Sequence, residues 1–273
     1  MSQTAPVLTE ADCQALEPNA RGEVEHDGVV RLCLAVPPSA PIGEMPHTIA
    51  FPDRLVPRSE WDDRIAEKDR EKSWLYDLVA GVIPCKDQAS LGYCHAYGYT
   101  AAGECCRAIQ GHPYVDLSAE SIGGPVTNWR NRGADPSDDL AQFATVGACP
   151  AAFMDAPHSL SPSRWKPGWE TEAAKYIATE IWDMRAGPGY KGMAFDFAVT
   201  MALLGLAGGV GFSWWTHFVS GPYKVRKSGR NYEILPRNNW GPRYGENGFF
   251  WLSEGRGTPD WSGCIRQMTG VDA

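Results

Sequence analysis

Apolar and small residues recur with helical spacing in the second half of the stretch PCKDQASLGYCHAYGYTAAGECCRAIQ, residues 84–110. The pattern predicts a polar loop that runs into a helix beginning near Cys94. One face of this helix would carry three residues spaced four apart: Tyr97, Ala101 and Cys105. Gly111 and Pro113 are typical of the end of a helix.

Similar spacing predicts further helices on either side of this stretch. They are expected to start near Ser59 and Ser73, and to cover 140–146, 170–181 and 194–207. The last of these would stop at the glycine pair Gly208–Gly209.

β-branched and aromatic residues then predict two strands, GVGFSWWTHFV at 209–219 and NYEILPRN at 231–238. The turn signal RKSGR lies between them. If the turn is centred near Ser228, antiparallel partners have residue numbers that sum to about 456. His217 then faces position 239, so the turn alone brings it next to Asn238.

The first fifty residues predict an extension, with one surface strand at Val29–Ala35 and the linker PPSAPIGEMP after it. The N-terminal residues MSQTAPVLTEADC lack the basic and apolar regions of a secretory signal. We therefore expect most of the eight cysteines to be reduced and the protein to be cytoplasmic, or in a host cytoplasm or virion if it is phage-encoded.

Charge and composition narrow the possible partners. The formal net charge is 25 − 33 = −8 and no basic run stands out, so no nucleic-acid partner is expected. The longest apolar stretch, Met201–Phe212, is too short to span a bilayer, so no membrane partner is expected either.

Two stretches resemble the signature sequences of the papain-like cysteine proteases, of the compact bacterial or phage type. DQASLGYCHAY at 87–97 resembles the active-site segment D-Q-G-S-C-G-S-C-W-A-F, and RNNWGPRYGENGFFWL at 237–252 resembles K-N-S-W-G-x-x-W-G-E-N-G-Y. Leu91, His95, Asn239 and Tyr244 are among the positions where the chain departs from these patterns. Leu91 replaces a cysteine that is usually a disulfide partner, so packing is expected to hold this region.

The resemblance implies four catalytic residues. Cys94 would be the nucleophile, since a cysteine in the first turn of a helix feels the positive end of the helix dipole, which favours thiolate. His217 would be the paired acid and base, with its ring oriented by Asn238. Gln88 and the backbone amide of Cys94 would stabilise the oxyanion.

The resemblance also implies substrate-binding residues. The stretch RGADPSDDLAQFATVGACP, residues 132–150, is similar to the main-chain wall that accepts the substrate backbone, placed here at Gly133 and Ala134. Trp240 matches the indole that shields the histidine–asparagine pair. The long helical propeptide of papain-like zymogens has no counterpart in residues 1–50.

The fold expected from the resemblance is papain-like α+β: an extension at 1–50, a helical lobe with the nucleophile at 51–150, and a β-rich lobe with the histidine and asparagine at 151–273. The expected function is peptide-bond hydrolysis through a thiolate–imidazolium pair and an acyl-enzyme, with a protein or peptide as substrate. Two alternatives stay open: a catalytically inactive papain-like structural or binding protein, such as a phage virion component, and an amidase or transamidase.

No metal or other cofactor is expected. The cluster formed by Cys94, His95, Cys105 and Cys106 lacks the paired short spacings of zinc sites. The sequence leaves the oligomeric state open.

Overall fold

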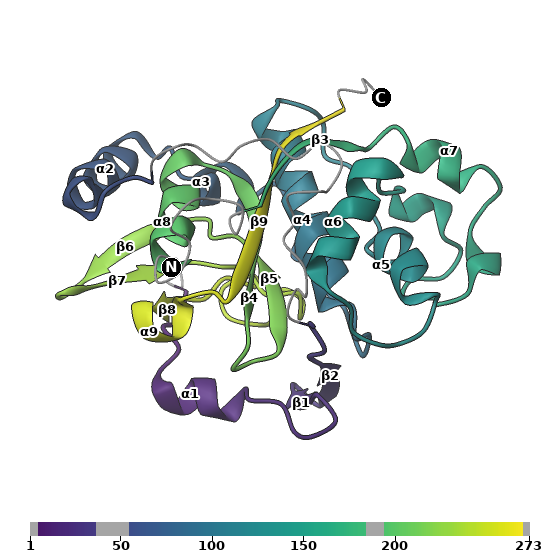
Figure 1. Cartoon of the computed structure of the whole chain (residues 1–273), viewed down its shortest axis with the longest axis horizontal. Coiled ribbons are helices and arrows are strands. Elements are labelled where there is room, and N and C mark those ends of the chain that lie inside the picture. The colour runs from purple at the N-terminus through teal and green to yellow at the C-terminus, as the bar shows by residue number, and fades with distance from the viewer. Residues whose placement is uncertain (1–4, 37–54, 184–193, 270–273) are drawn as a thin grey trace.

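The computed structural model describes residues 5–36, 55–183 and 194–269, so the linker predicted at 37–46 lies outside the described residues. Figure 1 shows α5, α6 and α7 on the right of the long helix α4, and the strands in the centre and on the left, where α2, α3 and α8 also lie. The helices are α1 (Glu10–Ala15), α2 (Arg58–Glu71), α3 (Leu75–Val79), α4 (Cys94–Ile109), α5 (Glu120–Thr127), α6 (Pro136–Thr145), α7 (Trp169–Ala173), α8 (Ala194–Leu204) and α9 (Glu254–Gly257).

The strands within each sheet are antiparallel. They are β1 (Glu23–His26), β2 (Val29–Leu32), β3 (Ala178–Asp183), β4 (Ala207–Phe212), β5 (His217–Ser220), β6 (Val225–Ser228), β7 (Asn231–Ile234), β8 (Leu252–Ser253) and β9 (Trp261–Met268). In the described residues they form a hairpin β1-β2, a sheet in the order β3-β9-β4-β5, and a sheet in the order β6-β7-β8. Mixed helices and antiparallel sheets confirm the predicted α+β class.

Helix α4 is the centre of the molecule because it is buried on nearly every side, from Cys94 to Arg107. Two glycines let neighbouring elements approach its backbone. A Cβ atom added at Gly98 would lie 2.6 Å from a ring carbon of Phe218, and one at Gly103 would lie 2.5 Å from the ring of Phe143. Strand β5 and helix α6 can therefore pack directly on α4.

The prediction of one strand at 209–219 is wrong, because this stretch folds into the hairpin of β4 and β5, with Phe212 opposite His217. A tight turn joins the strands, in which the backbone amide of Trp215 donates to the carbonyl of Phe212 at 3.1 Å. The Trp215 side chain is fully buried, so packing of this indole holds the turn.

The turn predicted near Ser228 is also displaced. Strands β6 and β7 pair Val225 with Ile234 and Ser228 with Asn231, so partner numbers sum to 459 rather than 456, and Gly229 takes the positive φ that the turn requires. His217 lies outside this hairpin.

The helix predicted at 170–181 is wrong over its second half. Helix α7 ends at Ala173, and Ala178–Asp183 forms strand β3, which pairs with β9. β-branched residues at 177, 179 and 181 favour the strand, and β9 supplies the partner that local spacing could not indicate. The helices predicted at 59 and beyond and at 140–146 are confirmed as α2 and α6. The helix predicted at 194–207 is confirmed as α8 only to Leu204: Gly205 takes a positive φ after it, and the predicted stop at Gly208–Gly209 lies inside strand β4.

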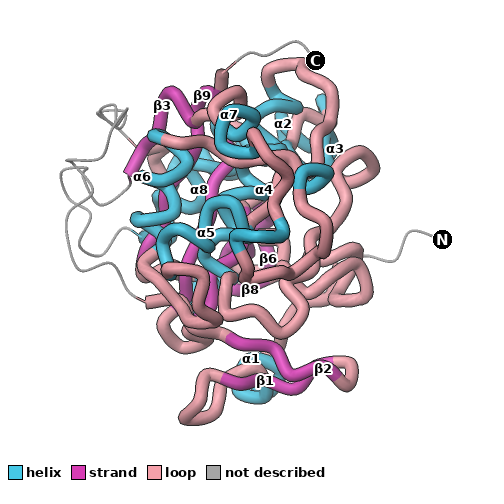
Figure 2. The backbone as a smooth tube through the Cα atoms, turned by 90° about the vertical axis from the view of Figure 1, so that its right-hand side faces the viewer, coloured by secondary structure: helices cyan, strands magenta, loops and turns pink. Residues whose placement is uncertain are grey.

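The N-terminal extension folds against the body of the molecule (Figure 2). Strands β1 and β2 form a hairpin whose two-residue turn is Asp27–Gly28, both at positive φ. The backbone amide of Leu8 donates to the carbonyl of Trp251 at 3.0 Å, so the start of the extension is tied to the β-rich side.

Within the described residues, no helix combines the length and the apolar character needed to cross a membrane.

Candidate active site

Cys94 is the first residue of α4, so its backbone amide has no carbonyl within the helix to bind. Its thiol is buried, close to the backbone amides of Phe218, Leu34 and His95, which lower the pKa of the thiol. Burial raises the pKa of Cys94 to about 11, and the hydrogen bonds from these amides lower it only in part. The thiol form therefore predominates at neutral pH in this structure.

His217 opens strand β5, one residue before the amide that contacts the Cys94 sulfur. Its Nε2 lies 2.8 Å from Oδ1 of Asn238, as the sequence predicted that the two residues would meet. The other ring nitrogen, Nδ1, is buried and has no hydrogen-bond partner among the described residues. Burial lowers the pKa of His217 to about 4, the bond to Asn238 raises it, and the positive charge of Arg31 lowers it further.

Aromatic rings enclose the histidine. The centroid of the Trp240 ring lies 5.3 Å from that of His217, and the centroid of Trp215 lies 4.6 Å away. Trp240 thus lies where the resemblance placed it, beside the His217–Asn238 pair, and Trp215 is a second indole that the sequence did not single out.

Asn239 joins the nucleophile helix to the histidine strand. Its side-chain Nδ2 donates to the carbonyl of Cys94 at 3.3 Å and to the carbonyl of Phe218 at 2.9 Å. In the sequence pattern, Asn239 stands out only as a replacement for serine. A side-chain amide has two N–H donors, whereas a hydroxyl has one. The replacement of serine by asparagine could therefore have indicated that this side chain binds two carbonyls.

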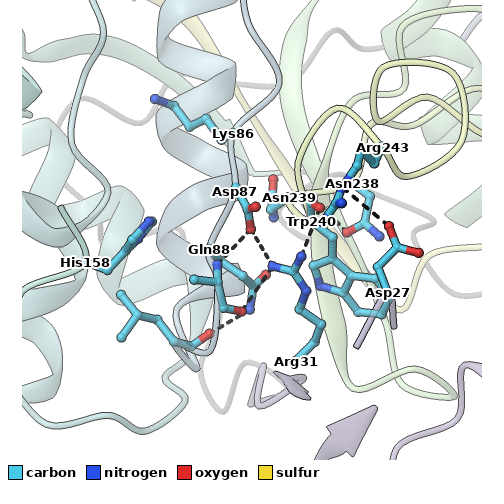
Figure 3. Close-up of polar contacts among 12 residues, drawn as sticks. Asp27, Arg31, Lys86, Asp87, Gln88, His158, Asn238, Asn239, Trp240 and Arg243 are labelled. Atoms are coloured by element: carbon cyan, nitrogen blue, oxygen red, sulfur yellow. Dashed lines mark hydrogen bonds and ion pairs between the residues drawn. The ribbon is translucent and has the colours of Figure 1, made fainter. Parts of the chain in front are cut away.

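The Gln88 side chain is fully buried, and Figure 3 shows its amide group among its hydrogen-bond partners. Its Nε2 donates to the carbonyl of Leu32 at 2.9 Å and to that of Leu91 at 2.7 Å. The amide expected to bind an oxyanion therefore holds a carbonyl of the chain's own N-terminal extension.

The predicted wall also contacts the extension. The carbonyl of Ala134 accepts a hydrogen bond from the backbone amide of Val36 at 3.1 Å. A Cβ atom added at Gly133 would lie 1.5 Å from the carbonyl oxygen of Leu34, so only glycine fits there. On the other flank, the amide of Ala35 donates to the carbonyl of Thr216 at 2.9 Å.

We call residues 31–36 the covering segment, because they cross Cys94 between the wall and the Gln88 loop. The segment explains why the site residues are closed to solvent: Cys94 and His217 are both 0% exposed. The sequence pattern predicts a surface strand at Val29–Ala35, whereas β2 ends at Leu32 and Arg31, Cys33 and Ala35 are buried. The turn signal Asp27–Gly28 could have revealed the hairpin, but not its docking place.

His95, the residue after the proposed nucleophile, pairs with Asp139 on helix α6. His95 Nδ1 lies 2.5 Å from Oδ2 of Asp139 on α6, and both side chains are fully buried. This pair ties α4 to the helix that follows the wall. In the described part of the chain, no three potential ligands gather to hold a metal ion.

A separate cavity of about 430 Å³ lies on the other side of the Gln88 loop. Lys86, Asp116, Tyr97 and His158 are among its lining residues, whereas Cys94 and His217 do not line it. The cavity is therefore distinct from the space over Cys94.

Comparison of the sequence with known protein families and with curated proteins finds no match. The structure is similar to xylellain, a cysteine protease from Xylella fastidiosa, with a TM-score of 0.57 and 18% identity over 86% of this chain and 95% of that one. It is also similar to procathepsin L 3 of the Tenebrio molitor larval midgut, with a TM-score of 0.55 and 13% identity over 93% and 77% of the two chains. A third similar structure is the ragweed pollen cysteine protease Amb a 11 in its proform, with a TM-score of 0.55 and 17% identity over 82% and 72%.

These similarities cover between 82% and 93% of this chain and confirm the predicted papain-like α+β fold. At identities below 20%, they establish the fold. The chain has the papain-like α+β fold of these cysteine proteases.

Proposed function

We propose that the protein is a cysteine peptidase in which Cys94, His217, Asn238 and Gln88 are catalytic. The observation that carries this proposal is the hydrogen bond between His217 Nε2 and Asn238 at 2.8 Å, which leaves Nδ1 without a partner among the described residues. Asn239 ties the strand that carries His217 to the carbonyl of Cys94. An orienting amide, an imidazole and a thiol at a helix start are the groups that thiol hydrolysis requires.

The reaction follows from these groups. Nδ1 of His217 takes the proton of the Cys94 thiol, and the sulfur attacks the substrate carbonyl carbon. The oxyanion that forms accepts hydrogen bonds from Nε2 of Gln88 and from the Cys94 backbone amide. The imidazolium then protonates the leaving amine as the C–N bond breaks, which leaves a thioester on Cys94. A water molecule deprotonated by His217 hydrolyses the thioester and restores the thiol.

In this proposal the described structure is a resting form. The covering segment occupies the groups that a substrate would use. Its Leu32 carbonyl binds the Gln88 amide, its Val36 amide binds the wall carbonyl of Ala134, and its Leu34 lies next to Cys94. Burial keeps Cys94 and His217 neutral, so displacement of the segment would both admit substrate and favour the thiolate–imidazolium pair. Two of the similar structures are a procathepsin and a proform, which supports this interpretation.

The test is covalent labelling with an epoxysuccinyl inhibitor together with hydrolysis of a peptide mixture. We expect labelling at Cys94, located by peptide mass spectrometry, and hydrolysis that Cys94→Ala abolishes. Cys105→Ala is the matched control, since that thiol lies on the same helix and contacts the hydroxyl of Tyr223 at 3.4 Å. Labelling without turnover of any peptide or amide would favour a structural or binding protein, and turnover of amides alone would favour an amidase.

A further inference from the structure

A buried guanidinium, that of Arg31, marks a binding site next to Gln88 (Figure 3). We call this site the notch; it consists of the Asp87 carboxylate and the carbonyls of Ala89 and Trp240. The Arg31 side chain is only 3% exposed although it belongs to the N-terminal extension. Its Nη1 forms an ion pair with Asp87 and donates to the carbonyl of Ala89 at 3.3 Å, and its Nη2 donates to the carbonyl of Trp240 at 3.2 Å. Three acceptors from two separate loops therefore face one planar cation.

The notch is built by the body of the protein and not by the extension. The backbone amide of Gly241 donates to the carbonyl of Lys86 at 2.9 Å, and the amide of Gln88 donates to the carbonyl of Asn239 at 2.8 Å. The amide of Ala89 donates to the Asp87 carboxylate at 2.8 Å and fixes its direction. Because none of these bonds involves residues 31–36, the acceptors keep their places when the covering segment leaves.

The position of the notch links it to substrate binding. The covering segment contacts the wall through Val36 and the Cys94 thiol through Leu34, and it reaches the notch through Arg31. Three residues of extended chain span about 10 Å. A substrate peptide that follows the path of the covering segment, from the wall across Cys94, therefore places a side chain in the notch within about three residues of the scissile bond.

We propose that Asp87, with the carbonyls of Ala89 and Trp240, is a guanidinium subsite that selects substrates with an arginine within three residues of the scissile bond, on the side away from the wall. This inference rests on the proposed peptidase function. A guanidinium reaches the carboxylate and the Trp240 carbonyl at once through two nitrogens, whereas a lysine ammonium is a single point donor. Arginine is therefore preferred over lysine as well as over neutral residues.

The experiment uses the full chain with Arg31→Ala, which empties the notch and loosens the covering segment. Peptides that carry arginine, lysine or citrulline at each position around the cleaved bond are compared by kcat/KM. We expect arginine to exceed citrulline, its neutral counterpart, by about tenfold at one position. Adding Asp87→Asn should bring this ratio close to one. Adding Asp62→Asn, a control carboxylate that pairs with Lys227 and is about as exposed as Asp87, should leave the ratio unchanged.

A second readout needs no turnover: arginine amide and citrulline amide are titrated onto Arg31→Ala and followed by nuclear magnetic resonance. We expect only arginine amide to bind, and only while Asp87 is present. Peptide cleavage with no arginine preference that depends on Asp87 would overturn the subsite and leave the peptidase intact. Binding of arginine amide through Asp87 without cleavage of any peptide would support the subsite and refute the proposed function, and absence of both would overturn both.

Discussion

At the scale of single residues, the chemistry depends on donors and acceptors that already have partners in the resting form. Gln88 is the clearest case, since its Nε2 binds the Leu32 carbonyl at 2.9 Å, in place of a substrate oxygen. Its backbone is in turn fixed by the carbonyl of Asn239 at 2.8 Å. The side chain is therefore held in place before substrate arrives, as an oxyanion donor must be.

The substitution Gln88→Ala distinguishes loss of transition-state stabilisation from a change in the accessibility of the Cys94 thiol. We expect turnover of peptides to fall by roughly 10²–10³, because one oxyanion donor is lost. Alkylation of Cys94 by iodoacetamide should not fall, since attack on a saturated carbon forms no oxyanion and loss of the Leu32 contact loosens the covering segment. Both rates are measured on the same preparation. Parent-level turnover in Gln88→Ala would rule out the oxyanion role.

The sequence indicates three of the four proposed catalytic residues because Cys94, Gln88 and Asn238 each lie in a short, ordered signature. His217 has no signature of its own, and the arithmetic that placed it beside Asn238 used a turn that lies elsewhere. His217 and Asn238 are brought together by the pairing of Ser220 with Arg237. The backbone amide of each of these two residues donates to the carbonyl of the other. The prediction reached the right neighbours through a register that was off by a few residues.

At the scale of elements, the packing of β5 on α4 sets the distance between nucleophile and histidine. Gly98 is one helical turn after Cys94, and it admits the Phe218 ring to a position where a Cβ atom would be 2.6 Å away. No pattern of apolar spacing marks this contact, because it depends on a residue without a side chain.

Replacing Gly98 with Ala should therefore disturb the site without touching a catalytic group. We expect a loss of about 1–3 kcal/mol in the free energy of unfolding, measured by denaturant titration, and a lower kcat as β5 shifts. Gly255→Ala is the control, because nothing lies within 4 Å of a Cβ added there. Equal stability of the two variants would show that the Phe218 contact is not tight.

The error at β3 has a long-range cause. Strand β3 is fixed by pairing with β9, which also pairs with β4, so that Ile181 and Ala207 lie opposite the same residue, Ile265. Local spacing carries no information about a partner more than fifty residues away.

At the scale of the whole molecule, the N-terminal hairpin is docked beside the site and continues into the covering segment. His26 of β1 packs between Trp240 and Tyr244, with ring centroids 5.5 and 5.1 Å away, and its Nε2 is buried without a partner in the described residues. Burial lowers the pKa of His26, and the nearby charges are Asp27, which raises it, and Arg31 and Arg243, which lower it.

Acid should therefore release the hairpin. A histidine whose pKa is lowered on docking favours the docked state above its ordinary pKa of about 6.5, and this contribution is lost as pH falls below that value. We expect amide hydrogen exchange in residues 29–36, corrected for intrinsic rates, to accelerate between pH 7 and pH 5. The change should be smaller in His26→Phe, which cannot be protonated. The same acceleration in both proteins would assign the effect to other groups.

The central claim is that Cys94 forms an acyl intermediate with the help of His217, and acid quenching during turnover tests it directly. The Arg31→Ala protein is mixed with excess peptide ester, quenched in acid within the first turnovers, digested and weighed by mass spectrometry. We predict that the peptide containing Cys94 carries the mass of the acyl group, and that this adduct is absent when His217→Ala is added. A protein that hydrolyses the ester while Cys94 stays unmodified, or that acylates equally without His217, would contradict the account.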